Sequence, residues 1–216
     1  MTDAEIAIGR VTRCSIRGFA GATQLPQPAF PAFGDFCRAE FRRARAASPA
    51  AAPTYAIGLI YDLSVQDDEL ARQLAAADQP TAEQLLDSQY RRAVPVEISA
   101  LTVGYRDGDR WAASLPPQPP LTLSPIYLLP DEDVRLFTED LGFVRHILGA
   151  EAVPPEDLLA AALRRAASAR PASARREYIL RAARETARRL SQDLGRLEIV
   201  LEGLREWGAR ESRSHG

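Results

Sequence analysis

The sequence predicts an α+β fold, in which a small, mainly antiparallel β-barrel with inserted short helices precedes a C-terminal helical extension. The spacing of apolar residues predicts this division, because their period changes from about two to about 3.6 residues at Pro130. We therefore assign the barrel to residues 1–130 and the helical extension to residues 131–216. The chain has 216 residues, of which 46% are apolar, so it can bury one good core or two small ones.

A long strand and a hairpin in the middle of the chain anchor the predicted barrel. Residues 94–105 are mostly β-branched or apolar, which is typical of a strand buried on much of both faces. Asp107-Gly108 tolerates positive φ at both central positions of a type I′ turn, so residues 111–115 should return antiparallel to the strand. The proline-rich residues 115–120 then end the pairing, and an apolar run follows at residues 121–129.

The N-terminal part of the chain predicts an interrupted strand and a loop. Residues 6–19 are strand-like, and a bulge at Gly9-Arg10 accounts for the change in the alternation of their apolar residues. Residues 18–21 contain two glycines and should loosen the chain. The proline-bearing residues 24–33 should then cross the outside of the sheet as an extended loop.

Two further strands follow, and a low-complexity connection separates them. The tight Gly34-Asp35 turn precedes a strand at residues 36–43. Residues 44–53 consist mostly of Ala, Ser, Pro and Arg, which is typical of an exposed connection. Residues 55–63 are largely apolar, so this strand should lie centrally, and Gly58 is small enough for a neighbouring strand to approach closely.

Two short helices should be inserted before the long strand. Asp67, Asp68 and Glu69 open the first of them, because negative charge suits the N-terminus of a helix. These carboxylates point in different directions from a first helical turn and have no histidine nearby, which argues against a metal site. Thr81-Ala82-Glu83-Gln84 matches a capping box, so residues 82–91 should form the second helix.

Beyond Pro130 the first two predicted elements are helices of moderate length. Asp131 caps the first helix, whose apolar residues share one face and whose end is signalled by Gly149. The dipeptide Pro154-Pro155 starts a second, alanine-rich helix that closes near Pro171.

The third predicted helix is long and carries a single apolar stripe. It is capped by Ser173 and runs to about Trp207, on the order of 50 Å at 1.5 Å per residue. Gly195 and Gly203 are poor helix formers that can bend it or let another helix approach closely. The stripe consists of Ile179, Ala183, Thr186, Leu190, Leu194, Leu197, Leu201 and Leu204.

The last third of this stripe predicts an assembly surface. The stripe is longer than the apolar face of the first predicted helix, so part of it needs another partner. Burying one leucine is typically worth about 1.5–3 kcal/mol, which is enough for four to support association. We therefore expect self-association or assembly with another protein through residues 190–207. The candidate assembly surface consists of Leu194, Leu197, Leu201 and Leu204.

Residues 164–196 are strongly positive, with ten arginines against three acidic residues, and offer a candidate contact for nucleic acid or an acidic partner. The alternative is an ordinary solvated face, because Glu185 and Arg189, like Glu177 and Arg181, have the i,i+4 spacing of helical ion pairs. The candidate contact residues are Arg175, Arg181, Arg184 and Arg188.

The composition argues against several kinds of site. All 27 cationic residues are arginine, so the chain has neither the Gly-Lys of a phosphate loop nor a lysine for Schiff-base chemistry. Cys14 and Cys37 lie in separate strand-like segments without a CxxC pair, which indicates buried free thiols rather than a zinc site.

His146 has apolar neighbours and should be a packed or rim histidine. We expect no catalytic residue, no metal, no cofactor and no hydrolysis of ATP.

The distribution of apolar residues also bears on localisation. Nothing before Thr12 resembles a signal peptide. No window approaches the eighteen or more consecutive apolar residues of a membrane-spanning helix. We therefore expect a cytoplasmic protein with no membrane partner and no evident small-molecule substrate.

Four short motifs, taken in order, carry a resemblance to a known family. They are Phe33-Gly34-Asp35-Phe36, residues 57–62 followed by Asp67-Asp68-Glu69, Val103-Gly104-Tyr105, and Leu115-Pro116-Pro117 leading to residues 123–126. Over roughly residues 6–130 the chain resembles the HAS-barrel, the barrel at the N-terminus of HerA-type DNA translocases. That barrel is related to the N-terminal barrel of rotary ATP synthase subunits.

The resemblance implies a role in assembly. In that family the barrel precedes a RecA-like motor, and the barrels help the subunits form a hexameric ring that moves DNA for a partner nuclease. This chain departs from the family where the motor should begin, because only helices follow. The resemblance therefore implies a non-catalytic assembly or adaptor protein, whose partner is a HerA-type translocase, its nuclease or a second copy of the chain. The alternative is a stand-alone nucleic-acid-binding barrel of the kind seen in translation and RNA-maturation factors.

Overall fold

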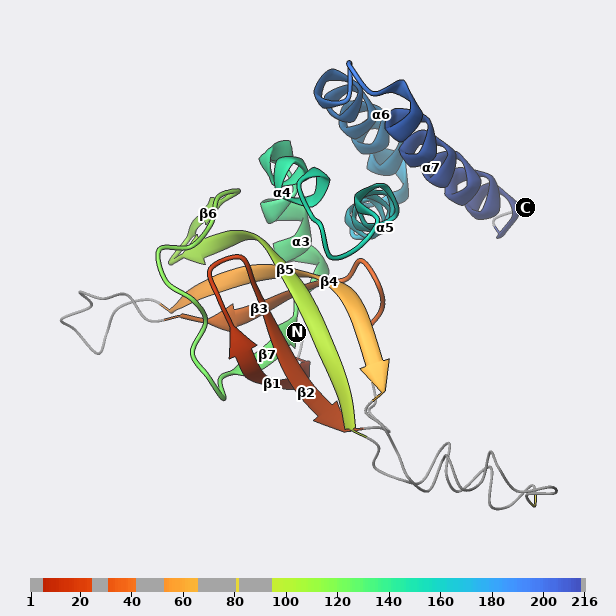
Figure 1. Cartoon of the computed structure of the whole chain (residues 1–216). Coiled ribbons are helices and arrows are strands. Elements are labelled where there is room, and N and C mark those ends of the chain that lie inside the picture. Colours follow the sequence, from red (N-terminus) through yellow and green to blue (C-terminus); the bar gives the residue numbers. More distant parts are fainter. Residues whose placement is uncertain (1–5, 25–30, 42–52, 66–80, 82–94, 215–216) are drawn as a thin grey trace.

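A computed structural model describes residues 6–24, 31–41, 53–65, 81 and 95–214. In these residues the chain forms strands up to residue 128 and helices from residue 131 onward (Figure 1). Both predicted inserted helices lie outside the described residues, as do most of the proline-bearing loop and almost all of the connection at residues 44–53.

The strands of the described residues form one antiparallel sheet. They are β1 (Ala7–Cys14), β2 (Gly18–Gln24), β3 (Phe36–Glu40), β4 (Thr54–Val65), β5 (Pro95–Asp107), β6 (Arg110–Ala112) and β7 (Pro125–Leu128). Their order is β2-β1-β7-β3-β4-β5-β6, and a further pairing of β2 with β5 closes six of them into a barrel. The predicted α+β fold with an antiparallel barrel is therefore confirmed, and β4 lies centrally between β3 and β5 as expected.

The first two strands depend on glycine to close the barrel. β1 changes register on both sides of the predicted bulge at Gly9-Arg10, once against β7 and once against β2. Residues 18–21, which the sequence predicts to be loose, belong instead to β2. A Cβ atom at Gly21 would lie 2.3 Å from Ile126 Cδ1. The glycines therefore allow β2 to approach its neighbours closely rather than loosening the chain.

The predicted hairpin is present, but its turn lies one residue later. Asp107 pairs with Arg110, so the loop is Gly108-Asp109 rather than Asp107-Gly108. Gly108 has a φ of 59° while Asp109 has no positive φ, which is the pattern of a type II′ turn rather than type I′. The return strand β6 ends at Ala112, so it is shorter than the predicted residues 111–115.

Two other glycines lie where bulky groups approach. Gly34 has a φ of 87°, and the carboxylate of Asp35 accepts a hydrogen bond from Ala32 N at 2.8 Å, which forms the predicted tight turn. A Cβ atom at Gly58 would lie 2.6 Å from Phe19 Cζ. The predicted close approach at Gly58 is therefore made by an aromatic ring from β2, which does not neighbour β4 in the sheet.

The helices begin directly after Pro130. They are α3 (Asp131–Phe137), the 3₁₀ helix η2 (Leu141–Phe143), α4 (Val144–Leu148), α5 (Pro155–Ser168), α6 (Ala172–Arg189) and α7 (Leu194–Ser214). The first predicted helix is thus divided into three pieces. α3 ends at Phe137 with Thr138 as its C-cap, and the carboxylate of Asp140 accepts a hydrogen bond from Gly142 N at 2.8 Å. Pro130 occupies the N-cap of α3, so Asp131 lies in the first turn and is not the cap.

The alanine-rich helix α5 agrees with its prediction, whereas the start of α6 differs slightly. Pro171, with an extended ψ of 145°, occupies the N-cap of α6 in place of Ser173. Figure 1 shows α6 and α7 as the outermost layer, with α5 between them and the barrel.

The single long helix predicted for residues 173–207 is wrong, because α6 and α7 are separate. The carboxylate of Asp193 accepts a hydrogen bond from Arg196 N at 3.2 Å and so caps the start of α7. The break lets α7 pack on α5 and bury Val200 and Leu204. The apolar period continues through the break, so periodicity alone predicts one helix.

The first apolar cluster fills the barrel. All six strands of the closed ring contribute to it, and this shared origin places the cluster inside the ring. Its buried members are Ile8, Val11, Phe19, Cys37, Ala39, Phe41, Ala56, Ile60, Ile98, Ala100 and Ile126.

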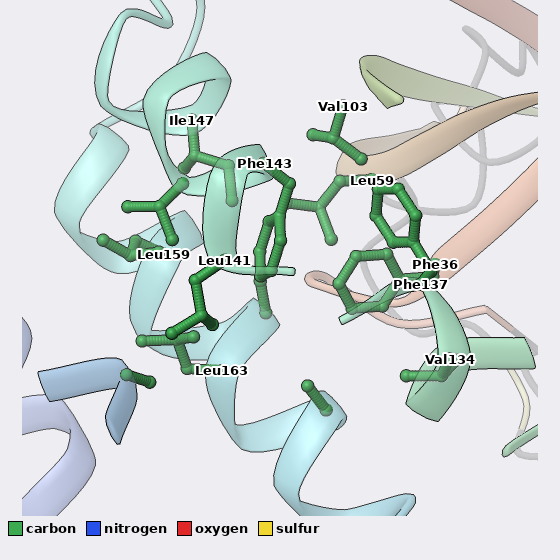
Figure 2. Packing of buried hydrophobic residues seen from close by; sticks show 14 of the residues in the cluster. Phe36, Leu59, Val103, Val134, Phe137, Leu141, Phe143, Ile147, Leu159 and Leu163 are labelled. Carbon is green, nitrogen blue, oxygen red and sulfur yellow. The ribbon is translucent and has the colours of Figure 1, made fainter. Parts of the chain in front are cut away.

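The second apolar cluster lies between the barrel wall and the helices. Figure 2 shows Phe36, Leu59 and Val103 of the barrel facing side chains of α3, η2 and α4. Phe36 lies 6.0 Å from both Phe137 and Phe143, measured between ring centroids, and the latter two are 5.7 Å apart. The predicted boundary at residue 130 therefore marks a change of secondary structure, while one core continues across it.

Candidate functional site

A groove with a volume of about 690 Å³ lies beside the barrel. The β1–β2 turn, the middle of β5 and the connection from α4 to α5 surround it. Its apolar lining includes Leu101, Leu115 and Val153. Its charged or titratable lining consists of Arg13, Cys14, Arg17, Tyr61, Arg145, His146 and Glu151. This size falls within the range of about 300–1,000 Å³ that is usual for small-molecule sites.

The turn between β1 and β2 holds Arg17 at the groove with a well-fixed backbone. The hydroxyl of Ser15 accepts a hydrogen bond from Arg17 N at 3.1 Å and lies 3.2 Å from Gly18 O, to which it donates. Arg17 O accepts a hydrogen bond from Thr102 N of β5 at 3.0 Å. Within the described residues the Arg17 side chain has no hydrogen bond or ion pair, so its guanidinium keeps all its donors.

α4 contributes a second guanidinium and a histidine. Arg145 Nη2 donates to Ala113 O at 2.9 Å, and Arg145 Nε lies 3.3 Å from His146 Nε2. Burial lowers the pKa of His146 below its ordinary value, and the charge of Arg145 lowers it further, although the contact with Ala113 O opposes this. The half-buried imidazole is therefore neutral at pH 7, as expected for a rim histidine, and the arginines supply the positive charge.

The charge of the groove is positive on balance. Arg13 is neutralised by Glu97, with 2.5 Å between Arg13 Nη2 and Glu97 Oε1. Glu151 is the single carboxylate among the described lining residues, whereas Arg17 and Arg145 are both cationic. The groove therefore suits an anionic ligand.

The groove also contains a buried hydroxyl. Thr102 is 1% exposed, and its Oγ1 has no hydrogen-bond partner among the described residues. An unpaired buried hydroxyl is unfavourable by roughly 1–3 kcal/mol, and because this oxygen is closed to solvent, it is not presented to a ligand in the groove.

The two cysteines are free thiols, and only one of them is fully buried. Cys37 lies inside the barrel, and this burial raises the pKa of its thiol well above the ordinary value, so it stays protonated. Cys14 is half-buried at the groove, where its Sγ donates to Pro120 O at 3.1 Å. No group of three His, Cys, Asp or Glu side chains in the described ranges is arranged to hold a metal ion.

The four arginines predicted as nucleic-acid or acidic-partner contacts lie on α6 in different states. Arg181 pairs with Glu139 at 2.9 Å, a tertiary contact in place of the predicted pair with Glu177. Arg188 pairs with Glu185, and Arg175 Nε donates to Arg170 O at 3.0 Å. Arg184 is exposed and has no such contact within the part of the chain that the structure describes. The structure therefore does not gather the four into one uncompensated patch.

The four leucines predicted as an assembly surface also lie in different environments. Leu194 is 71% exposed and Leu201 is 39% exposed, while Leu197 is half-buried. Leu204 is only 5% exposed and belongs to the core shared with the barrel. Leu194 and Leu201, two helical turns apart, are the part of the predicted surface that remains accessible.

The groove residues were not predicted as a site from the sequence. Arg17 and Arg145 line the same groove only because the barrel and α4 share a core, and no local motif relates two residues so far apart in the chain. The Ser15-x-Arg17 turn between two strands is the one local feature that indicates a fixed arginine.

No family model and no curated protein matches this chain. In the described ranges, no helix has a stretch that is both long and apolar enough to cross a lipid bilayer. Function is therefore inferred from the fold and the arrangement of the residues.

Proposed function

We propose that the protein is a non-catalytic, cytoplasmic assembly or adaptor protein related to HerA-type DNA translocase and nuclease machinery. The closed antiparallel barrel is compatible with the resemblance to the HAS-barrel, and the outer helices supply a surface for a protein partner. The partner is either a HerA-type translocase, its nuclease or a second copy of the chain.

The observation that carries this proposal is the exposure of large apolar side chains on the outer helices. On α7, Leu194, Ile199 and Leu201 are 71%, 51% and 39% exposed, and Leu180 on α6 is 46% exposed. Burying such a side chain is worth about 1.5–3 kcal/mol, which a partner gains against the entropic cost of association. A partner that covers several of these residues together with neighbouring surface is therefore expected to bind.

Protein binding is preferred to the alternative of nucleic-acid binding through α6. Arg181 and Arg188 are engaged by Glu139 and Glu185, so their charge is largely offset. Binding to nucleic-acid phosphates depends on cationic side chains that are not already paired with carboxylates, and only some of the α6 arginines are of this kind.

Analytical ultracentrifugation tests the proposal with the wild type and the double variant Leu194→Glu/Leu201→Glu. We expect the wild type to associate at tens of micromolar, alone or with a HerA-type translocase from the same genome, and the double variant to lose that association. Leu136→Glu is the matched control, because Leu136 is 51% exposed but lies on α3. A wild type that stays monomeric under both conditions would contradict the proposal, as would a double variant that unfolds.

We also propose that the protein does not hydrolyse ATP. The chain contains no lysine, so it has no phosphate loop of the Gly-Lys type used by the motor domains of this machinery. ATP turnover that copurifies with the protein through several columns would contradict this statement.

A further inference from the structure

We propose that the groove beside the barrel is a binding site for a nucleotide, whose phosphate lies between Arg17 of the β1–β2 turn and Arg145 of α4. This site is separate from the α7 surface and does not depend on the assembly function. It is a binding site with no reaction assigned to it.

The two guanidinium groups have the chemistry that phosphate requires. Arginine presents its donors as a planar fork, which can bind two phosphate oxygens at once. The Arg17 side chain is unpaired within the described residues, and Arg145 uses Nη2 for Ala113 O while keeping other donors. Because a single carboxylate, Glu151, lines the described part of the groove, these cations are not neutralised locally.

Both arginines are attached to backbone that is already ordered. The Arg17 main chain is held by Ser15 Oγ and by Thr102 N, and the latter bond joins the turn to β5. Arg145 lies on α4, whose Val144 and Ile147 are fully buried in the core shared with the barrel. A preorganised site loses less conformational entropy when it binds, so two arginines suffice for measurable affinity.

The remaining lining favours a nucleotide over a bare anion. The groove of about 690 Å³ has apolar walls at Leu101, Leu115 and Val153, which suit a base or another flat apolar group. Inorganic phosphate would satisfy the cations but leave the apolar walls in contact with water.

A free mononucleotide and the terminal nucleotide of a single strand share this chemistry. Isothermal titration calorimetry of the full chain at low salt separates them, with inorganic phosphate, AMP and a 5′-phosphorylated oligomer of ten thymidines as three probes. We expect AMP to bind at least tenfold more tightly than inorganic phosphate. Tighter binding of the oligomer than of AMP would assign the site to a strand terminus, and equal or weaker binding would assign it to a free nucleotide.

Two variants decide whether the binding occurs in the groove. We expect Arg17→Gln and Arg145→Gln each to weaken binding of the preferred probe by about tenfold or more, as for a charge-assisted hydrogen bond. Arg184→Gln is the control, because Arg184 is exposed on α6 and is likewise unpaired in the described residues, and its binding should be unchanged. Arg17→Gln removes no contact of the described fold. This variant therefore shows whether the ligand binds in the groove even if Arg145→Gln is unstable.

The proposal is overturned if neither AMP nor the oligomer binds below millimolar concentration, or if Arg17→Gln binds like the wild type. The association of the Leu194→Glu/Leu201→Glu variant is measured separately, so failure of the groove proposal and failure of the assembly proposal are distinguishable.

Discussion

The helices attach to each other and to the barrel in two different ways. Where α3, η2 and α4 meet the barrel, the contact is apolar and closely packed, with Phe36, Phe137 and Phe143 in mutual edge or tilted contact. Where α6 joins the layer beneath it, a buried arginine makes many of the contacts. Arg170 donates to Thr138 Oγ1 at 3.0 Å, pairs with Glu139 at 3.0 Å and lies 3.7 Å from the centre of the Tyr178 ring.

From this difference we expect the barrel and the first helices to be a single stability unit. Although Tyr178 and Ala182 of α6 are buried in the same core, α6 is also held by hydrogen bonds and an ion pair that can be removed one at a time. Apolar packing is cooperative, because removing one ring leaves a cavity that affects every neighbour. Removing one hydrogen bond or one close contact between small residues affects fewer neighbours. The effect of a substitution on stability should therefore decrease from the inner junction to the outer surface.

The largest effect is expected at the inner junction. Phe143 is fully buried, and Phe143→Ala should lower the free energy of unfolding by about 3–5 kcal/mol through lost burial and a cavity. Denaturant unfolding followed by circular dichroism measures this, with Phe33→Ala as control because Phe33 is 42% exposed. If strand and helix signals were lost in separate transitions, the barrel and the first helices would not be one unit.

A smaller effect is expected at the arginine that anchors α6. Arg170→Met keeps much of the side-chain volume but removes the bonds to Thr138 and Glu139, so stability should fall by about 2–3 kcal/mol. The rate of backbone amide hydrogen exchange should rise more in α6 than in the barrel strands. Arg184→Met is the exposed control. Equal exchange changes throughout the chain would contradict the separation of the two layers.

The contact between α5 and α7 should be weaker still. A Cβ atom at Gly203 would lie 3.1 Å from Ala160 Cβ, so Gly203→Val should push α7 away from α5 and cost about 1–2 kcal/mol. Gly195→Val is the matched control, since a Cβ there meets nothing nearer than an Asp193 oxygen at 3.8 Å. We expect the thermal unfolding midpoint of Gly203→Val to be lower than that of Gly195→Val. Equal midpoints would place Gly203 outside the interface.

The smallest effect concerns pH. The hydrogen bond from Arg181, and then that from Arg170, lower the pKa of Glu139 below its ordinary value of 4.5, although partial burial opposes them. A carboxyl with a lowered folded pKa stabilises the fold above the unfolded value and loses this contribution as pH falls through the folded value. Between about pH 5 and pH 3 the wild type should therefore lose slightly more stability than Glu139→Gln, by less than about 1 kcal/mol because the pair is half-exposed. Parallel pH profiles would contradict this.

The parts of the fold that depend on local patterns could be predicted from the sequence. The alternating run at residues 94–105 and the change of period at Pro130 predict the long strand β5 and the first helical turn at Asp131. The division between α6 and α7 was missed because the apolar period continues through Leu190 and Leu194. The sequence signal for a new helix start at this point was Asp193, a residue that often caps helix N-termini, followed by Gly195.

The parts that depend on closure of the barrel could not be predicted in this way. Residues 18–21 contain no pattern that shows them pairing with β5, since that contact is made by distant residues. The same holds for the groove, which Arg17 and Arg145 line together only after the barrel has closed and α4 has packed against it. The leucine stripe was identified, but its division between core and surface at Leu204 and Leu201 depends on where α5 lies.

The closure of the barrel also determines the order in which this chain can fold. β1 pairs with β7, which joins Ala7 to Tyr127 near the opposite end of the barrel sequence. Such long-range contacts form slowly, because a long loop must lose its entropy before the pairing is gained. During synthesis β1 therefore has β2 as a partner but must wait for β7, and one row of its backbone groups stays unpaired until then. Since β7 is followed directly by α3, the ring closes just before the helices that cover it emerge.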